Sequence, residues 1–291
     1  MTEPRSEIRT ASDGYPIHVS VWDATAPLRA RVVVIHGVQS HGGWYHNLGR
    51  ILSQAGFEVH IPDRRGSGAN TKDRGDTPSA RRLIDDIAEL IRDLRNREPR
   101  VPSVLGAISW GGKTAIITAA DHPETIDALA VICPGLTPRV GVSTGERLRI
   151  ALAFLTNKRK LFPIPLSDPA LFTGEAEGQK FIATDPLGLR FATARLLVAS
   201  TLLDRLVKSA LPRVKAPTLL MLSGRDRIVD NAKTLEKFER LGCDAKRVIE
   251  YPDAHHTLEF EPDASRYALD LIDWIEKTLG ANLGAGAHLH S

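Results

Sequence analysis

The sequence predicts one α/β domain: an eight-stranded, mostly parallel sheet flanked by helices, with a helical insertion between strands 6 and 7, at residues 136–212. Two observations predict this class. Strand-like segments alternate with amphipathic helix-like segments through residues 1–135, and the alternation resumes at residues 213–279. This spacing is typical of a parallel sheet covered on both faces. The strand-like segments, such as residues 32–35, are continuously apolar, as strands buried on both faces are.

The expected elements follow from local signals along the chain. Asp13-Gly14 indicates a hairpin turn between the first two strands, Gly56 ends a helix, and Pro134-Gly135 closes the sixth strand. We expect strands at residues 7–11, 16–22, 31–35, 57–61, 104–108, 128–133, 217–222 and 247–251. We expect helices at residues 44–55 and 77–97, after Gly112 up to residue 120, from Asp230 onward, and at residues 262–279.

The regular alternation stops after the sixth strand. Residues 136–212 contain amphipathic helical segments and no convincing strand, so we expect a purely helical insertion. The last residues, 280–291, are small and loop-like, and we expect them to form a disordered tail.

Composition excludes several classes of protein. The 291 residues carry 38 basic and 35 acidic side chains, a net charge of +3, which is too small a surplus for a nucleic-acid partner. Cys133 and Cys243 lie far apart and have no metal-ligand spacing, so we expect neither a disulfide framework nor a zinc site. Residues 1–7 are polar, and the strongest apolar stretch is much shorter than the roughly 18 residues of a spanning helix. The sequence therefore predicts a soluble cytoplasmic protein.

The sharpest local motif places Ser109 between a strand and a helix, in Ala107-Ile-Ser-Trp-Gly111. A serine at such a corner is held in a strained conformation with its hydroxyl exposed. Small residues are needed two positions before and after it, because the strand and the helix approach closely. The motif therefore predicts a nucleophilic serine.

A phosphate-binding loop is an alternative interpretation of the same residues. Residues 107–114, ending in Gly112-Lys113-Thr114, differ by one methyl group from the G-x-x-x-x-G-K-[ST] pattern. Bulky Ile108 and Trp110 are unfavourable for a backbone cradle around phosphates, and no acidic strand end is apparent for Mg²⁺. A structural helix start with an exposed lysine is preferred over nucleotide binding.

Two further residues complete a catalytic set with Ser109. A serine nucleophile needs a base and a third group that orients the base, in the chain order Ser, Asp or Glu, His. Asp226 follows the seventh strand and His256 follows the eighth, at strand ends where such sheets build their sites. Asp230 is a competitor for the acid, but a helix begins there and we interpret it as an N-cap. Spacing alone does not separate His256 from His255.

Two backbone N–H groups are candidates for an oxyanion hole. One belongs to Trp110, the residue after the serine; the other should come from the loop after the third strand. Gly37 allows that loop to turn sharply, which favours the N–H of Val38. We interpret His36, in the same loop, as a structural residue.

On these motifs the chain resembles α/β-hydrolases, in particular the branch of monoacylglycerol lipases, lysophospholipases and serine-aminopeptidase-like proteins. The matching residues are His36-Gly37 with Ser40-His41-Gly42, Asp63-Arg64-Arg65-Gly66-Ser67-Gly68, Ala107-Ile-Ser109-Trp-Gly-Gly112, Gly224-Arg-Asp226-Arg-Ile-Val229, and Ala254-His-His256-Thr-Leu258. The resemblance spans residues 36 to 258. It implies a helical cap over the active site, and it favours His256, because the family's histidine follows this alanine by two positions.

The sequence departs from the family pattern at two places. Ala107 stands where many members have glycine, and it is also small. The loop after His36-Gly37 lacks the glycine and glutamate common there in monoacylglycerol lipases, so this loop does not by itself indicate a monoacylglycerol substrate.

The insertion indicates an apolar substrate. Apolar residues recur at helical spacing along residues 148–155, and basic residues flank this stretch on both sides. A cap helix packed on the core with solvated basic ends is the preferred interpretation, and peripheral contact with an anionic membrane is the other. Arg190 and Arg195 are either surface residues or contacts for a charged head group.

Together these features predict a serine hydrolase that cleaves small-molecule carboxylic esters with an apolar portion, such as monoacylglycerols or lysophospholipids, through an acyl-enzyme and without a cofactor. Thioesterase, C–C hydrolase and aminopeptidase activities use the same triad and stay open. A ligand-binding protein that keeps the fold without turnover is the alternative from another class. The oligomeric state is not predicted.

Overall fold

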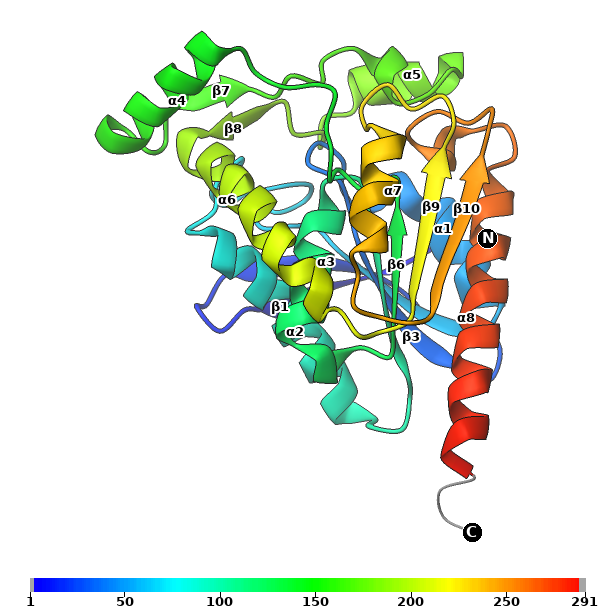
Figure 1. Cartoon of the computed structure of the whole chain (residues 1–291). Helices are drawn as coiled ribbons and strands as arrows, with labels where there is room; N and C mark the ends of the chain where they lie inside the picture. Colours follow the sequence, from blue (N-terminus) through cyan, green and yellow to red (C-terminus); the bar gives the residue numbers. More distant parts are fainter. Residues whose placement is uncertain (1–2, 288–291) are drawn as a thin grey trace.

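The computed structural model describes residues 3–287, with side chains described through residue 280. Its main sheet has eight strands, the number that the sequence predicts, and their order is β1-β2-β4-β3-β5-β6-β9-β10 (Figure 1). The strands are β1 (Arg5–Thr10), β2 (Pro16–Trp22), β3 (Ala30–Ile35), β4 (Phe57–Pro62), β5 (Ser103–Ile108), β6 (Ala128–Ile132), β9 (Thr218–Ser223) and β10 (Lys246–Tyr251). β2 pairs antiparallel with both β1 and β4, and all other neighbours in the sheet are parallel.

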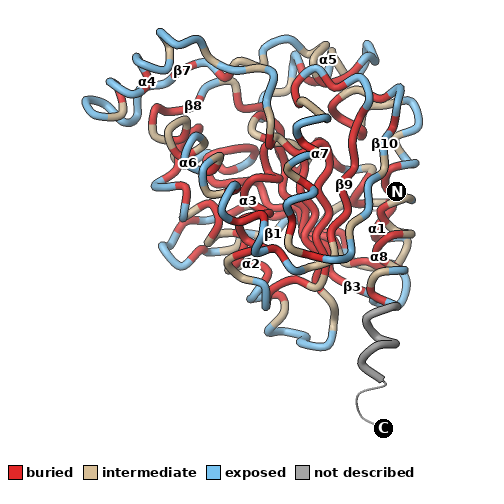
Figure 2. The backbone as a smooth tube through the Cα atoms, viewed as in Figure 1, coloured by how far each residue is buried: buried red, intermediate tan, exposed pale blue. Residues whose placement is uncertain are grey.

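Helices cover both faces of this sheet. The central strands are buried on both sides because alternate residues face opposite layers: Val33 and Ile35 pack in one apolar cluster, Val32 and Val34 in the other. The first cluster lies under α2 (Ala80–Arg97), α3 (Gly111–Asp121), α6 (Ala194–Ala210) and α7 (Asn231–Glu239); the second lies under α1 (His46–Gln54) and α8 (Ala264–Ala287). Figure 2 shows the buried strands between these layers. Single-turn 3-10 helices occupy Gly42–Tyr45, Pro123–Thr125, Pro169–Leu171, Leu211–Arg213 and Leu258–Phe260.

A cap-like insertion joins β6 to β9 at the upper edge of the sheet (Figure 1). It contains α4 (Thr144–Thr156), α5 (Ala176–Thr184) and α6, and α6 packs against α3 of the core. The expectation of a purely helical insertion is wrong: β7 (Leu161–Pro163) and β8 (Phe191–Thr193) form a small antiparallel sheet. Strands of three residues are too short to show the alternation that predicts a strand.

The apolar face expected on α4 does not pack on the core. Leu148, Leu152 and Leu155 are 69%, 63% and 80% exposed, while Ile150 and Ala153 on the other side of the helix are buried. α4 carries apolar residues on both sides, so its sequence does not reveal which side faces inward. The preferred interpretation, a helix whose apolar face packs on the core, is therefore corrected. Figure 2 shows that α4 is largely exposed.

The C-terminal helix is longer than predicted. α8 extends to Ala287, whereas its sequence predicts an end near residue 279 and a disordered tail from residue 280. Residues 288–291 lie outside the described part of the chain. None of the described helices combines the length and the hydropathy needed to cross a bilayer.

The strand order separates two loops at the carboxyl ends of the central strands β3 and β5. From β3 the chain proceeds to β4 on one side and then to β5 on the other. The loops that follow β3 and β5 therefore diverge at the carboxyl ends of adjacent strands, which is where open α/β sheets bind their ligands.

Candidate active site

Ser109 occupies the corner between β5 and α3. Its φ is +54°, a left-handed conformation that non-glycine residues adopt rarely and at a cost. The corner is tight: a Cβ on Gly111 would lie 2.6 Å from the carbonyl oxygen of Ile35. Ala107, two positions before the serine, is fully buried beside Ile35 in the sheet. Small residues are therefore required on both sides of Ser109, as the sequence motif predicts.

The structure brings Ser109, His256 and Asp226 into one chain of hydrogen bonds. Ser109 Oγ lies 2.8 Å from His256 Nε2, and His256 Nδ1 lies 2.7 Å from Asp226 Oδ2. The three residues are 30 or more positions apart and follow β5, β9 and β10, so the fold alone assembles them.

The surroundings of Asp226 keep its carboxylate ionised. Burial alone would raise its pKa, but the adjacent His256 and the backbone N–H groups of Val229 and Ile228 lower it below its ordinary value. Both N–H groups lie 2.8 Å from Oδ1, which leaves Oδ2 for the imidazole. An ionised acceptor at Nδ1 places the ring hydrogen there, and Nε2 is then free to accept from Ser109.

The competing acid and base occupy other positions. Asp230 accepts from the N–H of Lys233 at 3.2 Å and caps α7, as the N-cap interpretation predicts. His255 turns away from Ser109, and its Nδ1 lies 3.2 Å from Glu261. The geometry therefore places His256, and not His255, beside Ser109, a choice that the sequence spacing alone left open.

Val38 and Trp110, the expected oxyanion residues, line the same cavity as Ser109. Among the described residues, neither backbone N–H donates to a protein acceptor. Trp110 directly precedes α3, at the end of the helix where N–H groups point outward. Gly37 lets the loop that carries Val38 approach Ser109 closely, because a Cβ on Gly37 would lie only 3.3 Å from Ser109 Cβ.

His36 stabilises the loop that carries Gly37 and Val38 through two hydrogen bonds of its buried imidazole. Its Nε2 accepts from the N–H of Arg64 at 2.8 Å, so Nδ1 carries the hydrogen and donates to the Gly37 carbonyl at 2.7 Å. Burial, assisted by the charge of Arg64, lowers the pKa of His36 to about 3. A neutral, fully buried imidazole agrees with the structural role expected from the sequence.

Polar contacts join the cap-like insertion to the nucleophile helix α3. Trp110 Nε1 donates to Ser200 of α6 at 2.8 Å, and Lys113 Nζ lies 2.5 Å from Asp204 one turn later. The expectation of an exposed lysine at this helix start is wrong, because Lys113 is buried and its ammonium pairs with Asp204. No sequence pattern marked Ser200 or Asp204, because their partners lie about 90 residues away.

The two arginines considered as head-group contacts are also engaged within the protein. Arg195 donates to the buried carboxylate of Asp76 at 3.0 Å, and Arg190 donates to the carbonyl of Ala183 at 3.1 Å. Among the described residues, no cluster of His, Cys, Asp or Glu has an arrangement suited to a metal ion.

The cavity above Ser109 is small and mainly apolar, with a volume of about 190 Å³. The insertion supplies most of its roof. The residues of the insertion that line it are Pro138, Val140, Ile164, Pro165, Leu166, Ala192, Leu196, Leu197, Ser200 and Asp204.

The sheet, the strained serine corner and the insertion after β6 define an α/β-hydrolase fold. The chain belongs to the serine aminopeptidase (S33) family, whose model matches residues 26–263. It is 24% identical over 267 residues to a monoacylglycerol lipase of Mycolicibacterium smegmatis, covering 90% of this chain and 93% of the relative. It is 26% identical over 252 residues to a phospholipase of Bacillus subtilis, covering 83% and 93%.

A solved structure has the same fold over nearly the whole chain. It is a soluble variant of the Saccharomyces cerevisiae monoglyceride lipase in complex with a substrate analog, at a TM-score of 0.85 and 19% identity. The superposition covers 96% of each chain. This likeness confirms the fold, and the curated relatives of this S33 family member include a monoacylglycerol lipase and a phospholipase.

Proposed function

We propose that this protein hydrolyses carboxylic esters of lipid type, with Ser109 as the nucleophile. The observation that carries the proposal is the hydrogen-bond chain from Ser109 through His256 to Asp226. Ser109 Oγ attacks the ester carbonyl while His256 Nε2 takes its proton, and Asp226 stabilises the imidazolium that forms. His256 then returns the proton to the departing alcohol, and water attacks the acyl-enzyme by the same route with the roles reversed.

The N–H groups of Val38 and Trp110 hold the oxyanion in this scheme. Donors directed at a developing negative charge, in a site shielded from water, stabilise the transition state more than the ground state. Both residues line the Ser109 cavity, and within the described part of the chain neither N–H donates to a protein acceptor, which supports this assignment.

The cavity supports a substrate with an apolar acyl portion. Ile164, Leu166, Leu196 and Leu197 line its roof, and an apolar lining favours alkyl chains over charged groups. A volume of about 190 Å³ is smaller than the roughly 300–1,000 Å³ of ordinary ligand pockets. We therefore expect the insertion to move away from Ser109 when a long acyl chain binds.

The likeness to a monoacylglycerol lipase and to a phospholipase supports a lipid monoester, either a monoacylglycerol or a lysophospholipid. A thioesterase, a C–C hydrolase and an aminopeptidase could use the same three side chains. A protein that binds such ligands without turnover is the alternative from another class.

A panel of substrates with one acyl group in common tests the proposal. The octanoyl derivatives of glycerol, glycerophosphocholine, a thiol and an amine are each compared by kcat/KM, with Ser109→Ala as the background. We expect the two oxygen esters to exceed the thioester and the amide at least tenfold. A preference for the thioester or the amide would replace the proposal, and binding without turnover of any of the four would indicate the non-catalytic alternative.

The exposed side of α4 supports peripheral contact with an anionic membrane. Leu148, Leu152 and Leu155 form an exposed apolar stripe, which we call the α4 stripe. Exposed basic residues lie next to this stripe in the sequence: Arg149 follows Leu148, and Lys-Arg-Lys at residues 158–160 follows Leu155. An apolar face bordered by basic residues is the arrangement that binds anionic bilayer surfaces. The stripe lies on the insertion, so such contact would place the substrate source beside the cap.

A further inference from the structure

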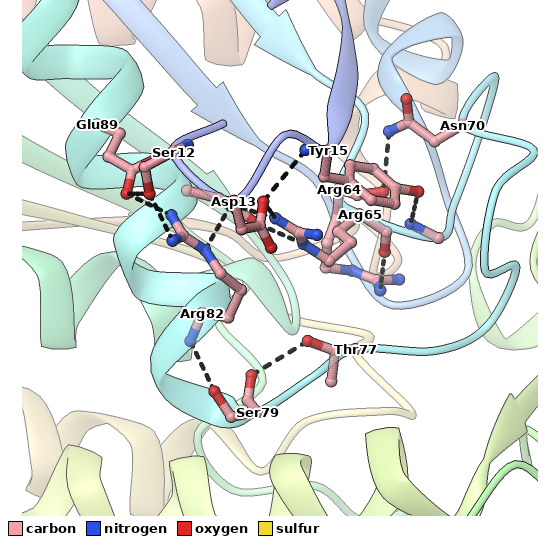
Figure 3. Close-up of polar contacts among 12 residues, drawn as sticks. Ser12, Asp13, Tyr15, Arg64, Arg65, Asn70, Thr77, Ser79, Arg82 and Glu89 are labelled. Atoms are coloured by element: carbon pink, nitrogen blue, oxygen red, sulfur yellow. Dashed lines mark hydrogen bonds and ion pairs between the residues drawn. The ribbon is translucent and has the colours of Figure 1, made fainter. Parts of the chain in front are cut away.

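Arg64 is a buried arginine without an acidic partner. It is 8% exposed, and among the described residues no carboxylate lies within ion-pair distance of its guanidinium. Burial lowers its pKa to about 10, so it remains protonated at neutral pH. Its neighbour Arg65 is also buried, but it pairs with Asp86 at 2.8 Å and Asp13 at 3.0 Å. Figure 3 shows Arg65 in this polar cluster, with Tyr15 beside it.

The contacts of Arg64 lead instead to the proposed oxyanion residues. One terminal nitrogen donates to the carbonyl oxygen of Val38 at 2.8 Å. The guanidinium carbon lies 5.1 Å from the centre of the Trp110 ring, a cation–π distance. The main chain of Arg64 is fixed as well, because its N–H donates to His36 at 2.8 Å.

We infer that Arg64 is a positioning residue that holds Val38 and Trp110 in place, so that their N–H groups converge on the oxyanion. This inference rests on the proposed function. The two N–H groups come from loops after different strands, and the hydrogen bonds of the described residues include none that joins Val38 directly to Trp110. The planar guanidinium of Arg64 bonds to Val38 and stacks on Trp110, and it thereby sets the distance between them. A lysine ammonium on its flexible stem would not do so.

The cost of the arrangement supports a functional role. A buried charge without an ion-pair partner is unfavourable, and a long apolar side chain would fill the same space without that cost. Arg64 Nε is also buried without a hydrogen-bond partner among residues 3–287. The protein therefore retains a side chain that is unfavourable for folding at a point where it contacts both proposed oxyanion residues.

The experiment compares matched variants of the full chain. Arg64→Met removes the guanidinium, Arg64→Lys keeps the charge without the planar fork, and Arg65→Met removes the adjacent buried arginine that does not contact Val38 or Trp110. Each is assayed for kcat and KM on p-nitrophenyl butyrate and for the affinity of butylboronic acid, which forms a tetrahedral adduct on the serine. The melting temperature is recorded for each variant.

For Arg64→Met we expect kcat to fall on the order of 10- to 100-fold, with KM within about twofold and boronate affinity reduced by the same factor as kcat. Arg64→Lys should lose on the order of 10-fold. Arg65→Met should lower the melting temperature while its kcat and boronate affinity stay near wild type.

Each other result decides against the inference. Equal kcat losses in Arg64→Met and Arg65→Met, or a wild-type kcat in Arg64→Met, would overturn it. If neither Arg64 variant folds while Arg65→Met does, the role is structural and the inference fails. If the wild-type chain hydrolyses no ester, the proposed function fails first; if it does hydrolyse esters and Arg64→Met matches it, only the inference fails.

Discussion

His255 and His256 are adjacent in the chain but belong to different networks. His255 Nδ1 lies 3.2 Å from Glu261, at a partly exposed position, whereas the fully buried imidazole of His256 bonds to both Ser109 and Asp226. The turn after β10 directs the two side chains to opposite sides, so only one of them can take the serine proton.

This difference predicts opposite outcomes for two similar substitutions. His256→Ala removes the base and should lower kcat on a p-nitrophenyl ester by at least about 10³-fold. His255→Ala loses only a partly exposed contact with Glu261 and should keep kcat within about threefold, since such pairs contribute little. Steady-state kinetics on both purified variants check this. Retained activity in His256→Ala together with its loss in His255→Ala would transfer the role to His255.

Glu259 predicts a pH dependence of stability. Its carboxylate accepts from the N–H groups of Asn47 and Leu48 and from the Tyr267 hydroxyl, yet burial raises its pKa from 4.5 to about 7. Between pH 4.5 and about pH 7, Glu259 is therefore protonated in the folded state and ionised in the unfolded chain. The stabilisation is complete below pH 4.5 and is lost as the pH rises to about 7, by up to about 3 kcal/mol.

Glu259→Gln tests this pH dependence. The amide keeps an acceptor for the two N–H groups but does not ionise, so its free energy of unfolding relative to wild type should rise between pH 5 and pH 8. Urea denaturation at several pH values measures that difference. A constant difference across the range would mean that folding does not raise the pKa of Glu259 above its ordinary value.

The α4 stripe predicts binding to anionic vesicles. Replacing Leu148, Leu152 and Leu155 together with glutamine removes the exposed apolar surface without touching the buried side of α4. We expect sedimentation with vesicles containing phosphatidylglycerol for the wild type, weaker binding to neutral phosphatidylcholine vesicles, and at least a tenfold loss of affinity in the triple variant.

A matched control comes from α8, which lies on the other side of the molecule from α4 (Figure 1). Leu269 of α8 is 57% exposed. Leu269→Gln should leave vesicle binding unchanged. Equal losses of vesicle affinity in this variant and the triple variant, or no vesicle binding by the wild type, would contradict membrane contact through the α4 stripe.

The positions that meet around Ser109 could be proposed from the sequence because they depend on local signals. A strand–turn–helix motif marks Ser109, and Asp226 and His256 each follow a readable apolar strand. Parallel strands place their carboxyl ends at one edge, so the order of the elements predicts that these residues come near one another.

Other features depend on packing between distant segments, which leaves no local signal. α4 is apolar on two sides, and its packing against distant residues of the insertion, such as Phe162 and Ala194, decides which side is buried. β7 and β8 are each three residues long and pair across 27 intervening residues. Arg64 contacts a backbone carbonyl and an indole ring, neither of which requires a complementary charge elsewhere in the sequence.

Labelling with a fluorophosphonate tests the central claim most directly, because the probe reacts with a serine only when a base activates it and an oxyanion hole accepts the phosphoryl oxygen. We predict a single adduct on Ser109 in the wild-type chain by peptide mass spectrometry, and none in Ser109→Ala. An unlabelled wild-type chain, or equal labelling of both proteins, would contradict the assignment of Ser109 as the nucleophile.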